Sequence, residues 1–212
     1  MGKAPVTPTA PRTRLSRAER EQQVLAAARA LFAERGYGAV TMDDVATAVG
    51  VTKPLLYMYF GNKERLYLAC MEPAADELRD AVASAVAEAE RPADALEPGV
   101  KAFFSFVDRD RDAWRVLFDE TLPAGGEVAR RVAEQREELE ALVAGLVVAR
   151  LPGRHRGRAA VEVEALSTAL LGAAESLARW WLRSGALTAD EAAELLIETV
   201  EPGLRARTTG ET

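Results

Sequence analysis

Residues 51–66 read VTKPLLYMYFGNKERL, and the helix that residues 53–60 can form decides the interpretation of the whole chain. At about 100° per residue, Leu56 and Phe60 fall on one side of that helix, as a core-facing pair does. A helix that is apolar all round is either buried on every side or faces a partner. The second face therefore predicts a partner, because it is apolar too and carries Pro54, Leu55, Met58 and Tyr59.

The residues before this stretch predict two further helices. From about residue 16 apolar side chains recur at helical spacing, and Gly36 ends that helix. Thr41 begins a short second helix, which breaks at Gly50. Three helices within residues 16–60, with a tight turn around Gly50 between the last two, form a helix-turn-helix layout. The second helix of such a pair enters the major groove of DNA.

This region resembles the N-terminal domain of the TetR family of transcriptional regulators. The resemblance is dense over about 45 residues, and beyond residue 70 it continues only as a helical pattern and a total length. It implies a homodimer that binds operator DNA and is released by a small molecule bound in an all-helical body. The residues that carry it are Ala28, Leu31, Phe32, Gly36, Tyr37, Thr41, Ala46, Gly50, Val51, Leu56, Tyr57, Phe60 and Lys63.

The third helix offers chemistry suited to DNA. Lys53, near its N-terminus, can donate to guanine O6 or N7, and Pro54 offers apolar surface to thymine methyl groups. Phenolic and ammonium groups further along suit phosphates. The alternative is that the tyrosines pack only against neighbouring helices. The predicted DNA-binding residues are Thr41, Thr52, Lys53, Pro54, Leu55, Tyr57, Tyr59 and Lys63.

The resemblance adds detail to these contacts. In the family, the positions that match Tyr57 and Lys63 contact the DNA backbone, whereas many members carry a histidine in place of Tyr59. Arginines at the start of the chain can enter an A·T-rich minor groove, with a merely solvated tail as the alternative. These arginines are Arg12, Arg14 and Arg17.

Charge and composition separate a basic head from an acidic body. The net charge is −6, yet residues 1–70 hold ten Lys or Arg against six Asp or Glu. One cysteine and one histidine cannot build a disulfide framework or a Cys/His metal cage, so no metal or cofactor is expected. No nucleophile–base pair is evident, which argues against an enzyme. The chain lacks an apolar leader and a long apolar run, so we expect a cytoplasmic protein without a membrane span.

We expect an all-α fold of about nine helices, because no strand signal or internal repeat is present. The predicted layout is a flexible basic arm over 1–15, a helix-turn-helix domain over 16–63, a helical ligand-binding and dimerisation domain over 64–207, and a disordered tail over 208–212.

The body carries two candidate sites whose alternative in each case is plain core packing. An aromatic group would line the pocket that the resemblance implies, namely Phe103, Phe104, Phe106, Trp114, Phe118 and Trp180. Apolar and small residues of the last two helices would form the dimer interface, namely Leu166, Ala169, Leu170, Gly172, Ala173, Leu177, Trp181, Leu195, Leu196 and Thr199.

The sequence therefore predicts a DNA-binding transcriptional regulator, a repressor that is released by a small, largely apolar ligand. The alternatives are an architectural DNA-binding protein that senses no ligand, and an activator of the same fold. The ligand, the operator sequence and the target genes are open at this stage.

Overall fold

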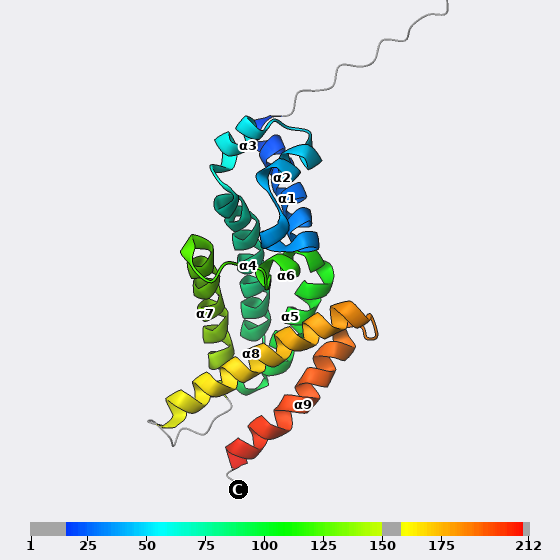
Figure 1. Ribbon diagram of the computed structural model, residues 1–212. Helices are drawn as coiled ribbons and strands as arrows, with labels where there is room; N and C mark the ends of the chain where they lie inside the picture. The colour runs from blue at the N-terminus through cyan, green and yellow to red at the C-terminus, as the bar shows by residue number, and fades with distance from the viewer. Residues whose placement is uncertain (1–15, 150–157, 210–212) are drawn as a thin grey trace, which may run out of the picture.

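The computed structural model describes residues 16–149 and 158–209 of the chain, and in these ranges every regular element is helical. Figure 1 shows α1 to α3 at one end, α8 and α9 at the other, and α4 running between them. The predicted all-α fold with about nine helices is confirmed. The elements are α1 (Arg17–Ala39), α2 (Met42–Val49), α3 (Lys53–Phe60), α4 (Lys63–Ala87), the 3₁₀ helix η1 (Pro92–Asp94), α5 (Leu96–Arg109), α6 (Arg111–Leu117), α7 (Gly126–Val148), α8 (Arg158–Ser184) and α9 (Ala189–Thr209).

Local chemistry explains where the first helices begin and end. Ser16 and Thr41 each cap a helix with a reciprocal capping box, to Glu19 and Asp44 respectively. Gly50 ends α2 with φ 72° and ψ 35°, a left-handed conformation that glycine adopts without penalty. The predicted helix starts and stops are therefore present in this region.

Two apolar cores share α4, so we describe the molecule as a head and a body. The head comprises α1 to α3 and the first half of α4, where Leu66 and Met71 are buried among head residues. The second half of α4 places Leu78 and Val82 in the body core, with α5 to α9. The continuous helix α4 therefore enters both cores, and α6 and α7 also reach the head core through Val116 and Val128.

The body core is built largely on aromatic side chains. Phe103 meets Phe104 and Trp114 edge to face, with ring centroids 5.2 and 5.4 Å apart. Trp181 is also buried here and donates from Nε1 to the Leu187 carbonyl at 2.6 Å. Its neighbour Trp180 is 44% exposed. The prediction that assigned Trp180 to the pocket and Trp181 to the dimer interface is therefore wrong on both counts.

Two boundaries differ from the sequence-based expectation. The boundary predicted between the helix-turn-helix domain and the body, at residues 63 and 64, falls in the first turn of α4. The core of the head extends further along that helix. The last helix, α9, continues to Thr209, two residues into the segment predicted as a disordered tail. No helix in the described ranges is long and apolar enough to cross a membrane.

Candidate nucleic-acid interface and ligand cavity

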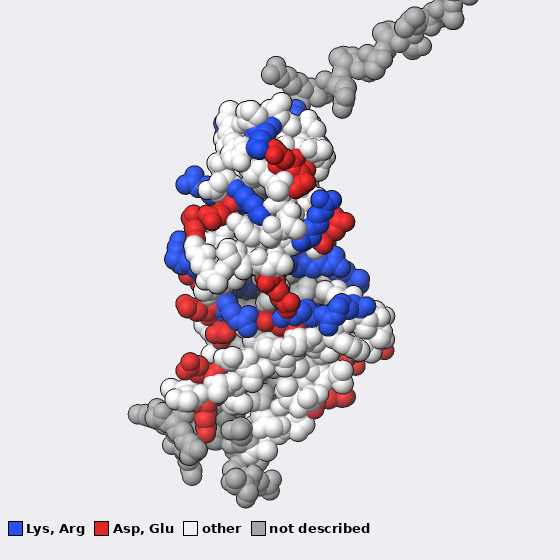
Figure 2. Space-filling model, in the orientation of Figure 1, with Lys and Arg blue, Asp and Glu red and all other residues white. Residues whose placement is uncertain are grey.

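The free face of α3 is apolar, as the sequence predicted. Leu56 and Phe60 are buried in the head core, while Tyr57 and Met58 on the same helix are 42% and 63% exposed. Thr52 precedes the helix, is exposed, and makes no side-chain capping bond. In Figure 2 the tip of the head shows few charged side chains. Such an exposed apolar face with hydroxyl groups fits a partner that has its own polar and apolar surface.

Lys53 and Asp43 form an exposed ion pair across the turn between α2 and α3. Lys53 Nζ lies 2.8 Å from Asp43 Oδ2, and the two side chains are 50% and 63% exposed. The hydrogen bond to Asp43 raises the pKa of Lys53, so the ammonium stays charged. An exposed pair of this kind holds its partners weakly, so the ammonium can turn to a base or a phosphate.

The other side chains predicted to bind DNA differ in whether they already contact other residues of the chain. Lys63 lies over the Tyr37 ring at 4.2 Å, and burial lowers its pKa. The Thr41 hydroxyl is committed to the Asp44 carboxylate of its capping box. The Arg17 guanidinium lies 5.5 Å from the centre of the Tyr59 ring.

Pro54 is exposed, and Leu55 and Tyr59 are half-buried. Thus the structure brings the predicted residues of α3 together on the tip of the head. Thr41 and Lys63 stand at the starts of the flanking helices α2 and α4. Arg12 and Arg14 lie outside the described residues.

A polar contact that sequence reasoning missed joins the head to the body. We call it the head–body latch: the turn Gly36–Tyr37–Gly38 and the loop Asp119–Glu120–Thr121. Tyr37 N donates to Asp119 Oδ2, and Gly38 N donates to Thr121 Oγ1 at 3.1 Å. Asp119 Oδ1 accepts in turn from Thr121 N and Oγ1, each at 2.7 Å.

The latch depends on the backbone of Gly36. Its φ of 76° and ψ of 162° interrupt α1 before one more turn to Ala39, close to the predicted end of the helix. This region of the backbone map is open essentially to glycine alone. The glycine pattern in the sequence hinted at a sharp turn, but nothing local could name a partner 82 residues away.

The helix α6, which precedes the latch loop, is tied to the head at both ends. At its start Arg29 of α1 contacts Asp110 at 2.9 Å, while Asp110 also caps α6 through Ala113 N at 2.9 Å. Near its end the Val116 carbonyl accepts from the hydroxyl of Tyr67 on α4. The start of α6 is thus linked to α1 and its end to α4.

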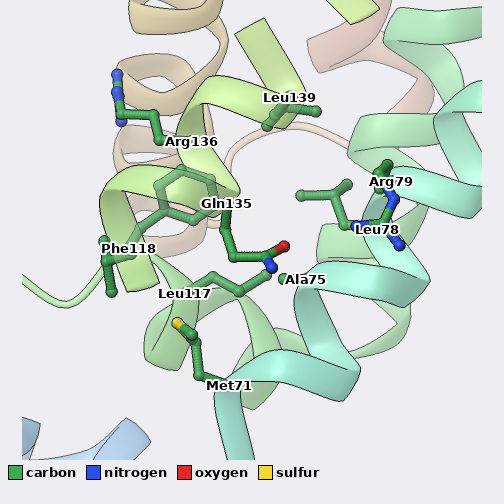
Figure 3. A pocket seen from close by; sticks show the side chains of 10 residues that line it. Met71, Ala75, Leu78, Arg79, Leu117, Phe118, Gln135, Arg136 and Leu139 are labelled. Atoms are coloured by element: carbon green, nitrogen blue, oxygen red, sulfur yellow. The ribbon is translucent and has the colours of Figure 1, made fainter. Parts of the chain in front are cut away.

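A largely apolar cavity opens between α4, α6 and α7, directly beside the latch loop. It is partly open to solvent and has a volume of about 60 Å³. Figure 3 shows Phe118 and Leu117 from the end of α6 on one side, and Ala75 and Leu78 from α4 on the other. Because Phe118 immediately precedes Asp119, the cavity wall and the latch are consecutive in the chain.

The aromatic residues predicted to line a pocket have mostly a different role. Phe118 lines this cavity, and Phe103 lines a second hollow of about 40 Å³ between α4, α5, α7 and α8. Phe104, Phe106 and Trp114 are buried in the cores and line neither hollow. Most of the aromatic residues predicted to line a pocket are therefore core residues.

The face of α8 and α9 that could pair with a second copy is only partly the predicted one. Leu170, Trp181 and Leu196 are buried inside the chain, so their assignment to an interface is wrong. Four predicted residues are half-buried, namely Leu166, Gly172, Ala173 and Leu177. The exposed residues of this face are Val161, Ala165, Ala169, Ser176, Trp180, Leu195 and Thr199.

Two family models match the chain. Residues 24–70 match the model described as bacterial regulatory proteins, tetR family. Residues 92–201 match the one described as tetracyclin repressor-like, C-terminal domain. The first match covers most of the head, and the second covers most of the body from η1 to α9.

Individual proteins are similar over most of their length. The HTH-type transcriptional activator FasR of Mycolicibacterium smegmatis is 33% identical over 171 residues, 81% of this chain and 76% of FasR. The HTH-type transcriptional repressor KstR2 of Rhodococcus jostii is 28% identical over 188 residues, 87% of this chain and 91% of KstR2. The structure of AibR in complex with isovaleryl coenzyme A and operator DNA shares the fold at a TM-score of 0.70 and 22% identity, covering 85% of this chain and 97% of AibR.

Proposed function

We propose that this chain represses transcription as a cytoplasmic homodimer bound to a palindromic operator. The proposal starts from the family: the chain belongs to the tetR family of bacterial regulatory proteins and is a DNA-binding transcriptional regulator rather than an enzyme. A small, largely apolar molecule in the body then releases it. The observation that carries the DNA-binding part is the exposed face of α3, where Tyr57 and Met58 stand clear of the core.

The proposed contacts follow from where α3 presents its side chains. Lys53 at the N-terminal end reaches base edges once it leaves Asp43, and Pro54 and Leu55 meet thymine methyl groups. Phosphate oxygens accept hydrogen bonds from the hydroxyl groups of Tyr57, Tyr59 and Thr52, and Lys63 adds an ammonium group. Thr41 contributes through its position at the start of α2. The arginines Arg12, Arg14 and Arg17 extend the contact into the minor groove.

The homodimer proposal is supported by the exposed face of α8 and α9. Small side chains along α8, from Ala165 to Ser176, allow close approach of a second helix, and Trp180 and Leu195 supply apolar area. Figure 2 shows that the side of the molecule over α8 and α9 is mostly uncharged. A symmetric pair would present two α3 helices to half-sites one helical turn apart, roughly 34–36 Å.

Release by a ligand follows from the proximity of the cavity to the latch. A cavity of about 60 Å³ holds about four to six water-sized groups. An occupant that reaches deeper than this volume allows moves a wall, and Phe118 lies on the wall that leads to Asp119 and Thr121. The shift of the latch would change the angle of the head and favour a dimer that no longer spans two half-sites. Among the fold's neighbours, AibR is described with both isovaleryl coenzyme A and operator DNA.

Activation is the second candidate, because FasR is described as an activator and KstR2 as a repressor. A reporter gene placed behind the operator distinguishes the two. Deletion of the regulator raises expression if it represses, and lowers expression if it activates.

The DNA-binding proposal is tested by fluorescence anisotropy with duplexes from upstream of the protein's own gene, over a series of salt concentrations. We expect Lys53→Ala to weaken specific binding by about tenfold or more. Lys63→Ala should lower the salt slope by about 0.9 per lost phosphate contact, hence about two units for a dimer. Lys101→Ala is the matched control, because Lys101 pairs with Glu97 within α5 of the body. If the three variants behave alike and random DNA binds equally well, the assignment of α3 is wrong.

A further inference from the structure

We propose that the cavity between α4, α6 and α7 binds an uncharged, compact, mostly apolar molecule that carries one hydrogen-bonding group, and that the side-chain amide of Gln135 holds this group. The inference rests on the proposed function, since it names the chemical class of the ligand for the same cavity. It is carried by the state of the three polar side chains in the cavity wall, Arg79, Gln135 and Arg136.

The two arginines in the wall are already paired. Arg79 Nη2 lies 2.7 Å from Asp76, and its Nη1 lies 2.6 Å from Glu138. These hydrogen bonds raise the pKa of Arg79. The guanidinium therefore offers little unmatched positive charge to an incoming anion, which would also meet the two carboxylates.

Arg136 cannot be released without cost to Glu175. Arg136 Nη1 lies 2.7 Å from Glu175 Oε1, and the Glu175 side chain is only 7% exposed. Burial raises the pKa of Glu175 against the opposing effect of Arg136. Oε1 accepts no well-aligned hydrogen bond, so the ionic contact is what stabilises its charge. A ligand carboxylate that drew Arg136 away would leave the buried Glu175 carboxylate with only the more distant Arg179, whose Nη2 lies 3.8 Å from Glu175 Oε2.

Gln135 is the polar group that is not committed. Its side chain is half-buried, and within the described ranges its amide has no hydrogen-bond partner. Figure 3 shows the amide extending between α7 and α4 toward Ala75, above Leu117, whereas Arg136 points away from it. An amide offers both donors and acceptors, so it can hold a carbonyl, a hydroxyl or an amide of a ligand. In apolar surroundings such a group needs a partner, which a neutral ligand or water supplies.

The size of the cavity limits the part of the ligand that fits without displacing the walls. About 60 Å³ corresponds to about four to six heavy atoms. Short aliphatic amides, ketones and esters meet this limit. Butyramide and butyrate are a matched pair of probes, because they have the same chain length and the same number of heavy atoms and differ in charge.

Methionine methyl resonances give a direct readout in the full-length protein. Met71 lines the cavity, while Met42 is buried in the head and Met58 is exposed on α3. We expect butyramide to shift the Met71 resonance saturably and to leave Met42 unchanged. Butyrate at the same concentrations should bind at least tenfold more weakly.

The variant Gln135→Leu removes the amide and keeps an apolar side chain of similar size at a half-buried position. It should weaken butyramide binding about three- to tenfold, the usual effect of one hydrogen bond. The matched control Gln22→Leu changes a glutamine of α1 that lies in the head, outside the cavity. Equal or tighter binding of butyrate, no saturable shift with butyramide, or unchanged binding in Gln135→Leu overturns the inference.

The proposed function is judged separately, by operator binding. If butyrate proves the better ligand and still lowers operator affinity, the regulator mechanism stands and the uncharged class of ligand is wrong. If butyramide binds through Gln135 and larger amides that fill the cavity never change operator affinity, the assignment of the amide stands and ligand release is wrong.

Discussion

Replacement of Gly36 by alanine tests the latch most sharply. An added Cβ would lie 2.6 Å from Thr121 Oγ1 and 3.0 Å from Thr121 Cγ2. The backbone conformation alone costs about 1–3 kcal/mol for a residue other than glycine. The overlap with Thr121 adds about 1–3 kcal/mol if the loop yields only in part. We therefore expect Gly36→Ala to lower the free energy of unfolding by about 2–6 kcal/mol.

Gly50→Ala is the matched control for this change. Gly50 also has a positive φ, 72°, but an added Cβ there has no neighbour within 4 Å. Its cost should thus be only that of a left-handed backbone, about 1–2 kcal/mol. Urea unfolding followed by circular dichroism gives both values, with the slope m checked for two-state behaviour.

A double-mutant cycle separates the contact from the backbone strain. Thr121→Ala removes the two atoms nearest to the new Cβ, at the cost of the hydrogen bond from Gly38. In that background Gly36→Ala should cost about 1–3 kcal/mol less than in the native chain. Additivity within about 0.5 kcal/mol, or a Gly36→Ala cost no larger than that of Gly50→Ala, would refute the contact between this turn and the loop.

Three further predictions concern other parts of the chain. Asp43→Asn frees the Lys53 ammonium and removes a negative charge near the DNA, so operator affinity measured by anisotropy should rise several-fold; an unchanged affinity would show that Lys53 does not reach the DNA. Burial raises the pKa of the Cys70 thiol to about 12, so Ellman's reagent should label it only at the rate of unfolding; rapid labelling of the folded protein would contradict this. Burial raises the pKa of Glu175 in the folded state above its ordinary value of 4.5. The native chain should therefore gain stability relative to Glu175→Gln as the pH falls from 7 toward 4.5, and lose that gain as the pH rises again. Parallel curves of stability against pH for the two proteins would contradict this.

The sequence predicted best what is decided within a few residues. The helix starts near Ser16 and at Thr41, the turn at Gly50 and the spacing of Leu56 and Phe60 are all local, and the structure contains each of them. These features place α3 and its free face. For that reason the DNA-binding surface could be predicted from the sequence alone.

Contacts between distant residues could not be predicted in this way. Two stripes without charge run side by side along α8. The buried stripe consists of Leu170, Ala174, Ala178 and Trp181, and the exposed stripe consists of the small residues Ala165, Ala169 and Ser176 together with Trp180. Because both stripes are apolar or small, helical periodicity does not show which one faces the chain's own core. The latch and the Arg136–Glu175 pair are likewise invisible to a local pattern, since they join segments 39 or more residues apart.

The central claim is that paired α3 helices read a specific DNA sequence. Repeated selection from a library of random duplexes, followed by sequencing, tests it without knowledge of the operator. The account predicts enrichment of an inverted repeat with half-sites about 10 base pairs apart, which is lost in Tyr57→Ala and retained in Lys101→Ala. No enriched sequence, or the same enrichment in both variants, would contradict it.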